Sequence, residues 1–191
     1  MRIIGGKYRG RRVFVPRSLT VRPTADRVRE AIFNILGAKV EGCRVLDLFA
    51  GSGALGLEAL SRGAAAAVFV DKRPEALLAV KRNIELLGLK KSTRTFKIDL
   101  NKGPGPLRKE SEPFDLVFID PPYGRNLIQR TLDLISRFNL TTPEALVVAE
   151  HSHKENLHQV SENWLLTEQR IYGQTKVAFF VKKSFNHANP E

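Results

Sequence analysis

The sequence predicts an α/β protein whose core is a mostly parallel sheet wrapped by helices. Short apolar β-type runs alternate with segments of helical periodicity along most of the 191 residues. The run Phe114–Ile119 is almost entirely apolar, as expected for a central strand that is buried on both faces. A glycine-rich turn joins the first such run to a helix, which is a common connection in parallel sheets.

The elements of the first half follow from their end signals. Thr24 is a suitable N-cap for a first helix that runs through Leu36, and Gly37 is expected to end it. Pro74 suits the first turn of a later helix, and Gly88 suits its C-cap. We predict strands over residues 44–49, 67–70 and 93–98, and helices from about residue 54 and over residues 74–87.

The second half continues the alternation after a glycine- and proline-rich loop over residues 101–113. Strands are predicted over 114–119, 145–149, 164–171 and 176–181, with a helix over 127–138. The last two strands are joined through Tyr172-Gly173-Gln174, a connection short enough for a hairpin, so the final strand should be antiparallel. We expect one catalytic domain over residues 23–183 and a disordered tail over residues 184–191.

Composition narrows the class of protein before any motif is considered. Cys43 is the only cysteine, so no internal disulfide is possible and a reducing compartment is indicated. No apolar stretch approaches the roughly 18 residues of a membrane span, and the sequence shows no secretory signal. These features predict a cytoplasmic protein with no membrane partner, and none of them requires an oligomer.

The charge of the chain points to a nucleic-acid partner. The formal net charge is +11 and the sequence pI is about 10.1. No acidic residue precedes Asp26, whereas residues 1–22 are rich in arginine. Alternation from Lys7 to Val15, with turns at Gly5-Gly6 and Gly10, predicts a structured basic β-hairpin arm that docks RNA or DNA. The expected phosphate contacts are Lys7, Arg9, Arg11, Arg12, Arg17 and Arg22.

The glycine-rich turn Gly51-Ser52-Gly53-Ala54-Leu55-Gly56 predicts a cofactor site. It matches GxGxxG, which by itself also fits a nicotinamide dehydrogenase. Asp47, at the carboxyl end of the preceding strand, favours a different cofactor. Its carboxylate would repel a pyrophosphate but can neutralise an ammonium group. S-adenosylmethionine carries that ammonium and no phosphate, so it is the expected cofactor.

Two further acidic residues end the next strands. Asp71 is placed to accept the ribose hydroxyls of an adenosine, and Asp99 is placed to contact the adenine edge. A solvent-facing loop position remains the alternative for Asp99. The expectation rests on the general rule that ligands of such sheets bind at the carboxyl ends of the strands.

The tetrapeptide Asp120-Pro121-Pro122-Tyr123 leaves the strand Phe114–Ile119 and predicts the catalytic site. The prolines hold the turn rigid and leave its carbonyls free to accept hydrogen bonds. The Asp120 carboxylate and the Pro121 carbonyl could accept both N–H groups of a base amine and so orient its lone pair for attack on a methyl group. Tyr123 offers a face on which the base can stack. The alternative is a purely structural turn.

With these motifs in place, the chain resembles the bacterial 16S ribosomal RNA guanine-N2 methyltransferases. The resemblance covers nearly the whole chain and is most specific over residues 22–34, Arg22-Pro23-Thr24-Ala25-Asp26-Arg27 onward. It implies the Rossmann-like class I methyltransferase fold, a seven-stranded sheet with an antiparallel last strand. It implies as substrate one guanine of 16S rRNA in an assembled or partly assembled small subunit.

The resemblance also places the cofactor contacts. Thr24 and Arg27 lie where the extra N-terminal motif of the family lies against the cofactor site. The chain departs from the family pattern at Ile98-Asp99-Leu100, where small residues commonly flank the acid. The full expected cofactor set is Thr24, Arg27, Asp47, Phe49, Ala50, Gly51, Ser52, Gly53, Asp71, Lys72, Asp99, Leu100 and Asp120.

Several alternatives stay open at this point. A DNA adenine-N6 or cytosine-N4 methyltransferase shares the tetrapeptide, although this chain has little room for a separate target-recognition region. A non-catalytic RNA-binding module could keep the same fold, and a dehydrogenase comes last. His151, His153 and His158 are interpreted as surface histidines rather than a metal site, so no metal is expected.

Overall fold

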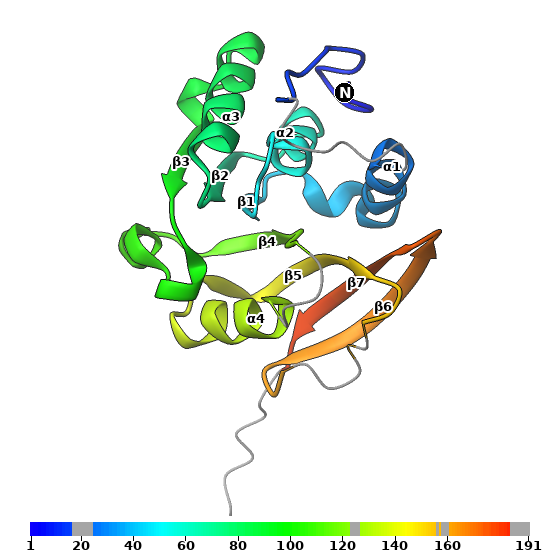
Figure 1. Ribbon diagram of the computed structural model, residues 1–191, viewed down its shortest axis with the longest axis vertical. Coiled ribbons are helices and arrows are strands. Elements are labelled where there is room, and N and C mark those ends of the chain that lie inside the picture. The colour runs from blue at the N-terminus through cyan, green and yellow to red at the C-terminus, as the bar shows by residue number, and fades with distance from the viewer. Residues whose placement is uncertain (17–24, 123–126, 156, 158–160, 184–191) are drawn as a thin grey trace, which may run out of the picture.

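The computed structural model describes residues 1–16, 25–122, 127–155, 157 and 161–183 (Figure 1). It has three layers, with helices α1 to α3 on one face of a central sheet and α4 on the other. The helices are α1 (Ala25–Leu36), α2 (Ala54–Ser61), α3 (Pro74–Leu87) and α4 (Leu127–Arg137). The strands are β1 (Arg44–Leu48), β2 (Ala66–Asp71), β3 (Thr93–Lys97), β4 (Phe114–Ile119), β5 (Thr141–Ser152), β6 (Trp164–Tyr172) and β7 (Thr175–Lys182).

The sheet has seven strands in the order β3-β2-β1-β4-β5-β7-β6. Strands β1 to β5 pair in parallel, and β7 pairs antiparallel with both β5 and β6. The predicted fold class is therefore confirmed, including the antiparallel last strand. Because the chain winds from β1 to one side through β2 and β3 and to the other through β4, the strand order reverses between β1 and β4. A ligand is expected at the carboxyl edge beside such a switch point.

Most element boundaries agree with the sequence, and the differences have local causes. The first strand was predicted to include Phe49, but the chain turns there with φ 64°, so β1 ends at Leu48. Strand β5 starts earlier than predicted, because Thr141 already pairs with Phe114 before a register shift. Gly37 ends α1 as expected, and a short 3-10 turn, Gly37–Val40, follows. Thr24 and the tail over 184–191 lie outside the described residues.

Apolar side chains form one core on each face of the sheet. The first packs α1, α2 and α3 against residues such as Val45, Phe118 and Val148. The second packs α4 against Val117, Ala149 and other residues of opposite parity on the same strands. Alternate residues of the central strands therefore face opposite layers, except at Phe114, which precedes the register shift in β4. Among the described residues, no helix has the length and apolar composition needed to cross a membrane.

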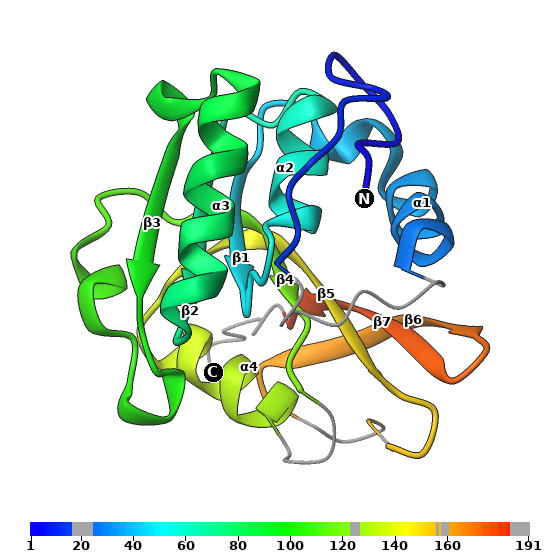
Figure 2. The same cartoon turned by 45° about the horizontal axis from the view of Figure 1, so that its top comes forward.

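The N-terminal arm is packed against the domain. Its two halves form a short antiparallel hairpin, with a bridge between Arg2 and Arg12 and backbone hydrogen bonds between residues 1–3 and 10–13. The predicted hairpin is therefore confirmed, although its pairing is too short to form two regular strands. Ile3 and Val13 are buried in the core on the α1–α3 side. In Figure 2 the arm begins between α1 and α2, turns back beyond one end of α2, and returns along that helix toward the end of β4. Other backbone N–H groups of the arm donate to α2 and α3, which fixes the hairpin against the domain.

Candidate active site

A cavity of about 570 Å³ lies at the carboxyl ends of the parallel strands. That size is in the usual range for a site holding a small molecule or cofactor. Its lining includes the turn after β1, the residue that ends β2, the residues after β3 and the turn after β4. The cavity therefore occupies the switch point between β1 and β4, where sheets of this topology bind ligands.

The turn after β1 contains two residues with a positive φ angle, Phe49 and Gly51. Phe49 adopts a left-handed φ of 64°, which is uncommon for a residue with a side chain and is characteristic of functional sites. Gly51 follows with φ 57°, and the Gly51 N–H donates to the Asp71 carboxylate at 3.0 Å. The turn is thereby tied to the end of β2. The cavity is lined by Phe49, Ala50, Gly51 and Ser52.

Asp47 is the buried carboxylate of the site. Its side chain is on β1 and its Oδ2 accepts from the Gly56 N–H at 2.9 Å. The pKa of Asp47 is raised to about 7, chiefly by burial and also by the charges of Asp120 and Asp71, while the hydrogen bond from Gly56 partly lowers it. A desolvated carboxylate of this kind gains most from a cationic ligand group.

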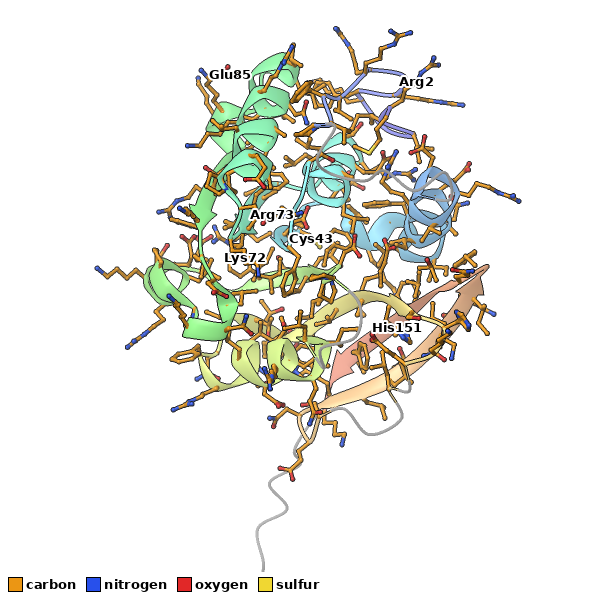
Figure 3. All side chains as sticks on the ribbon, in the orientation of Figure 1. Arg2, Cys43, Lys72, Arg73, Glu85 and His151 are labelled. Atoms are coloured by element: carbon orange, nitrogen blue, oxygen red, sulfur yellow. The ribbon has the colours of Figure 1, made fainter. Side chains whose placement is uncertain are left out.

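Asp71 ends β2, and the protein itself saturates its carboxylate. Oδ1 accepts from the Arg73 backbone N–H at 2.9 Å and from its Nε at 3.1 Å, while Oδ2 accepts from Arg73 Nη2 at 3.1 Å. Together with the Gly51 amide these bonds use about the four lone-pair sites of a carboxylate. Lys72 and Arg73 lie close together near the centre of the view in Figure 3, and both line the cavity.

Asp99 lies in the turn after β3 and begins a short 3-10 helix. Its carboxylate accepts from the Asn101 backbone N–H and side-chain amide, each at 3.1 Å. Both Asp99 and Leu100 line the cavity, so the residue does not simply face solvent. These bonds hold the loop in place.

Asp120, Pro121 and Pro122 form the wall of the cavity on the β4 side. Asp120 is exposed and Pro121 is buried, so the carboxylate can be reached from outside while the turn is anchored. The charge of Asp120 reaches Asp47 strongly enough to raise its pKa. Asp120 therefore lies close to Asp47 in the cavity. Tyr123 lies outside the described residues.

Two members of the expected cofactor set do not line the cavity. Arg27 is exposed on α1, and the same helix turns Val28 and Arg29 toward the cavity instead. Gly53 packs inward, since a Cβ on it would meet Leu57, Phe69 and Val80 at 3.3 Å. Thr24, which was expected beside them, lies outside the described residues.

Sequence comparisons agree with this geometry. A family model described as "Conserved hypothetical protein 95" matches residues 1–181. The ribosomal RNA small subunit methyltransferase D of Escherichia coli is 36% identical over 184 residues, covering 96% of this chain and 91% of that protein. The enzyme of the same name from Haemophilus influenzae is 35% identical and covers 91% and 89% of the two chains. The chain belongs to the family of small-subunit ribosomal RNA methyltransferases.

Solved structures support the same family. A structure from Escherichia coli, described as a methyltransferase, superimposes on this methyltransferase with a TM-score of 0.84 at 36% identity, covering 96% and 98% of the two chains. A Thermus thermophilus 16S rRNA N2 methyltransferase, in complex with AdoMet and guanosine, has a TM-score of 0.68 at 22% identity and covers 88% and 45%. The second likeness shows the shared fold alone.

The arm of the methyltransferase is held by buried polar side chains. The Glu58 carboxylate, fully buried on α2, accepts from the Ile4 and Gly5 N–H groups at 2.8 Å. Asn83, fully buried on α3, bonds to both the N–H and carbonyl of Phe14 and donates to the Ser52 carbonyl at 3.0 Å. Asn83 thus connects the arm directly to the glycine-rich turn.

The basic residues of the arm face outward. Lys7, Arg9, Arg11 and Arg12 are exposed, as a phosphate-binding surface requires. Arg17 and Arg22 lie outside the described residues. The sequence did not predict that Met1 and Val15 of the same arm line the cavity.

Several cavity residues were not predicted from the sequence. Arg73 could have been predicted as a cavity residue from its place in the basic dipeptide Lys72-Arg73 directly after Asp71. The sequence evidence for Glu150 was stronger, because Glu150 directly follows the predicted strand 145–149, as Asp120 follows β4. The other unpredicted residues from the second half of the chain include Arg130, Thr131, Leu134 and Thr175.

The prediction that His151, His153 and His158 lie on the surface is wrong for His151. His151 was expected on the surface, but it is fully buried in β5 within the β5–β7 part of the sheet (Figure 3). Burial lowers its pKa, and Gln169 lies 3.3 Å from its Nε2. His153 is exposed as predicted, and His158 lies outside the described residues. Within the described part of the chain, no group of three or more His, Cys, Asp or Glu is arranged to hold a metal ion.

Proposed function

We propose that this enzyme transfers a methyl group from S-adenosylmethionine to the exocyclic N2 amino group of one guanine in 16S rRNA. The observation that carries the proposal is the cavity itself. One wall consists of the glycine-rich turn with Asp47 and Asp71, and the other of Asp120 with its two prolines. A site for an adenosine-bearing amino acid and a site for a base amine thus meet in a single space.

The residues present fit S-adenosylmethionine as the donor. When bound, this cofactor supplies an electrophilic methyl group on a sulfonium centre. Asp47 is a desolvated carboxylate suited to the ammonium of its methionine end. Asp71, with Lys72 beside it, would hold the ribose after its two bonds from the Arg73 guanidinium are released, and Asp99 with Leu100 would hold the adenine. The hydrogen bonds that Arg73 donates to Asp71 resemble those a ribose diol would donate.

Asp120 and Pro121 would prepare the amine. An exocyclic amine is a weak nucleophile because its lone pair is delocalised into the ring. Hydrogen bonds from its two N–H groups to the Asp120 carboxylate and the Pro121 carbonyl would orient the nitrogen and favour an sp³ geometry. Its lone pair would then point at the methyl group, while the proton it loses passes to Asp120 or to solvent. This catalysis relies on positioning and electrostatics.

The arm supports RNA as the substrate. Its exposed arginines provide a cationic surface, and each could make bidentate contacts to phosphate. The relatives named above are methyltransferases of small-subunit rRNA, which supports a small-subunit particle in the bacterial cytoplasm as the natural substrate. The target base must be unstacked to enter the cavity, at a cost of about a few kcal/mol.

A transfer assay tests the proposal. Purified enzyme is incubated with methyl-labelled S-adenosylmethionine and small ribosomal subunits from a strain that lacks the homologous enzyme. We expect label in 16S rRNA, and mass spectrometry of the digested rRNA should locate it in one N2-methylguanosine. Label on adenine, on cytosine or only on duplex DNA would contradict the proposed function.

Asp120→Ala tests the role of the tetrapeptide. We expect turnover to fall by about 100-fold or more, because one charge-assisted contact to the reacting amine is lost. Affinity for S-adenosylmethionine should stay within about twofold, as calorimetry would show. The matched control is Asp133→Ala, an exposed carboxylate on α4. Near-normal turnover of the Asp120 variant would remove it from the catalytic machinery.

A further inference from the structure

Acidic residues lie at or within two residues of the carboxyl ends of five neighbouring parallel strands. In sheet order, from β3 to β5, they are Asp99, Asp71, Asp47, Asp120 and Glu150, and all of them line the cavity. The first three serve the cofactor in the proposed function, and Asp120 serves the base amine. Glu150 has no role in that scheme.

The register of the sheet places Glu150 beside Asp120. Strands β4 and β5 are parallel neighbours, and Ile119 pairs with Ala149. Asp120 and Glu150 are therefore the next residues on two strands about 4.8 Å apart. The base amine that Asp120 holds is thus within reach of a second carboxylate.

Strand alternation directs both side chains to one layer. Phe118 and Val148 belong to the core on the α1–α3 side, and Asp120 and Glu150 follow each of them by two positions. Asp47 has the same relation to Val45, which packs in that core. The carboxylates of these strands therefore converge on the cavity from one face of the sheet.

The chemistry of the target base gives the second carboxylate a use. Guanine carries an N1–H donor next to its amino group. Adenine and cytosine carry a ring nitrogen with a lone pair at the equivalent position. A carboxylate accepts a hydrogen bond from N1–H and repels a lone pair. A flipped base is read by hydrogen bonds along this edge.

We propose that Glu150 is the residue that selects guanine, by accepting the N1–H while Asp120 and the Pro121 carbonyl hold the N2 amino group. This inference rests on the proposed function and explains a point that the tetrapeptide leaves open. The same tetrapeptide would serve amines of adenine and cytosine, so a separate group must reject them. Rejection through an unpaired or repelled polar group is strong, because the mismatch is desolvated inside the site.

The test uses 2-aminopurine, which keeps the amino group of guanine but has a lone pair at N1. Small subunits are reconstituted with 16S rRNA carrying either guanine or 2-aminopurine at the nucleotide located by mass spectrometry. For the wild-type enzyme we expect kcat/KM to be about 100-fold lower on 2-aminopurine. Glu150→Gln offers an N–H to that lone pair, so it should lower the guanine rate and reduce this preference to about tenfold or less.

Control measurements distinguish a failure of the Glu150 inference from a failure of the proposed function. Glu144→Gln changes an exposed carboxylate on the same strand and should keep the wild-type preference. Affinity for S-adenosylmethionine, measured by calorimetry, should be equal in all three proteins and shows that Glu150→Gln is folded. Methylation of guanine with an unchanged preference in Glu150→Gln overturns the inference and leaves the proposed function standing. A wild-type enzyme that methylates neither purine substrate overturns both.

Discussion

At the scale of single residues, Asp47 and Asp120 differ in environment although their charges interact. Asp47 is almost fully buried, with 2% of its surface exposed, whereas Asp120 is exposed at the cavity wall. Burial disfavours the ionised form of Asp47 unless a cationic ligand group is bound beside it, while Asp120 remains accessible to an incoming base. Two carboxylates of the same type can thus serve different ligands because desolvation separates them.

The raised pKa of Asp47 predicts a pH dependence of cofactor binding. The ammonium binds the ionised form, and the pKa of the empty site is about 7. Affinity for S-adenosylmethionine should therefore rise several-fold between pH 6 and pH 7.5, by at most about tenfold per pH unit. Calorimetry at fixed ionic strength measures it. Asp47→Asn should bind weakly at both pH values, and a pH profile that matches wild type would contradict the assignment.

The same shift has an opposite consequence for the stability of the empty protein. The pKa of Asp47 is about 7 in the folded state against 3.8 for the unperturbed group, so the folded state binds more protons between those values. The contribution of Asp47 to stability therefore falls as the pH rises from about 4 to 7. Binding of the cofactor should remove this loss, because the ammonium compensates the charge.

At the scale of elements, α2 and α3 do more than cover the sheet. The carboxylate of Glu58 binds two amides of the arm and forms ion pairs with Arg62 at 2.8 Å and Arg29 at 3.6 Å. Gly6 must approach α2 closely, since a Cβ there would overlap the Ser61 carbonyl carbon and oxygen. These contacts make the arm part of the folded domain, so the position of its basic residues is fixed relative to the cavity.

Glu58→Gln tests this attachment. The change keeps the shape of the side chain but leaves two arginines without their buried counter-charge. Loss of a buried charge partner costs about 3–5 kcal/mol, which corresponds to a fall in Tm of roughly 6–20 °C for a domain of this size. Thermal unfolding measures it, and hydrogen exchange at Ile4 and Gly5 should become faster. Glu30→Gln, an exposed site on α1, is the control; equal Tm values for the two variants would contradict the proposed attachment.

At the scale of the whole molecule, the arm and the cavity differ in charge. Residues 1–16 carry basic but no acidic side chains, whereas the cavity is lined by both carboxylates and basic side chains, although the net charge of the chain is +11. The tip of the arm contacts Ser61 at the end of α2 that lies away from the glycine-rich turn. Since α2 has eight residues, the tip lies on the order of 12 Å along the helix from the cavity. The arm would therefore bind phosphates some nucleotides away from the methylated base.

Neutralising the arm tests this arrangement. The triple variant Arg9→Gln, Arg11→Gln, Arg12→Gln should bind small-subunit RNA more weakly and release fewer counterions. The slope of log affinity against log salt should become less negative by about 2–3. The control replaces Lys90, Lys91 and Arg94, exposed residues at the amino end of β3, away from the cavity. An unchanged slope in the arm variant, measured by filter binding, would exclude a phosphate-binding role.

Local sequence signals determined the order of helices and strands, the glycine-rich turn, and the acids of β1, β2, β3 and β4. These features depend on periodicity and end signals within a few residues, so they can be read without knowing which strands pair. Only the tertiary structure decided that α1 turns Arg29 rather than Arg27 to the cavity, and that His151 is buried. It also decided that β5 lies beside β4, which brings Glu150 next to Asp120. Such outcomes depend on strand register and helix orientation, which are set by contacts between residues far apart in the chain.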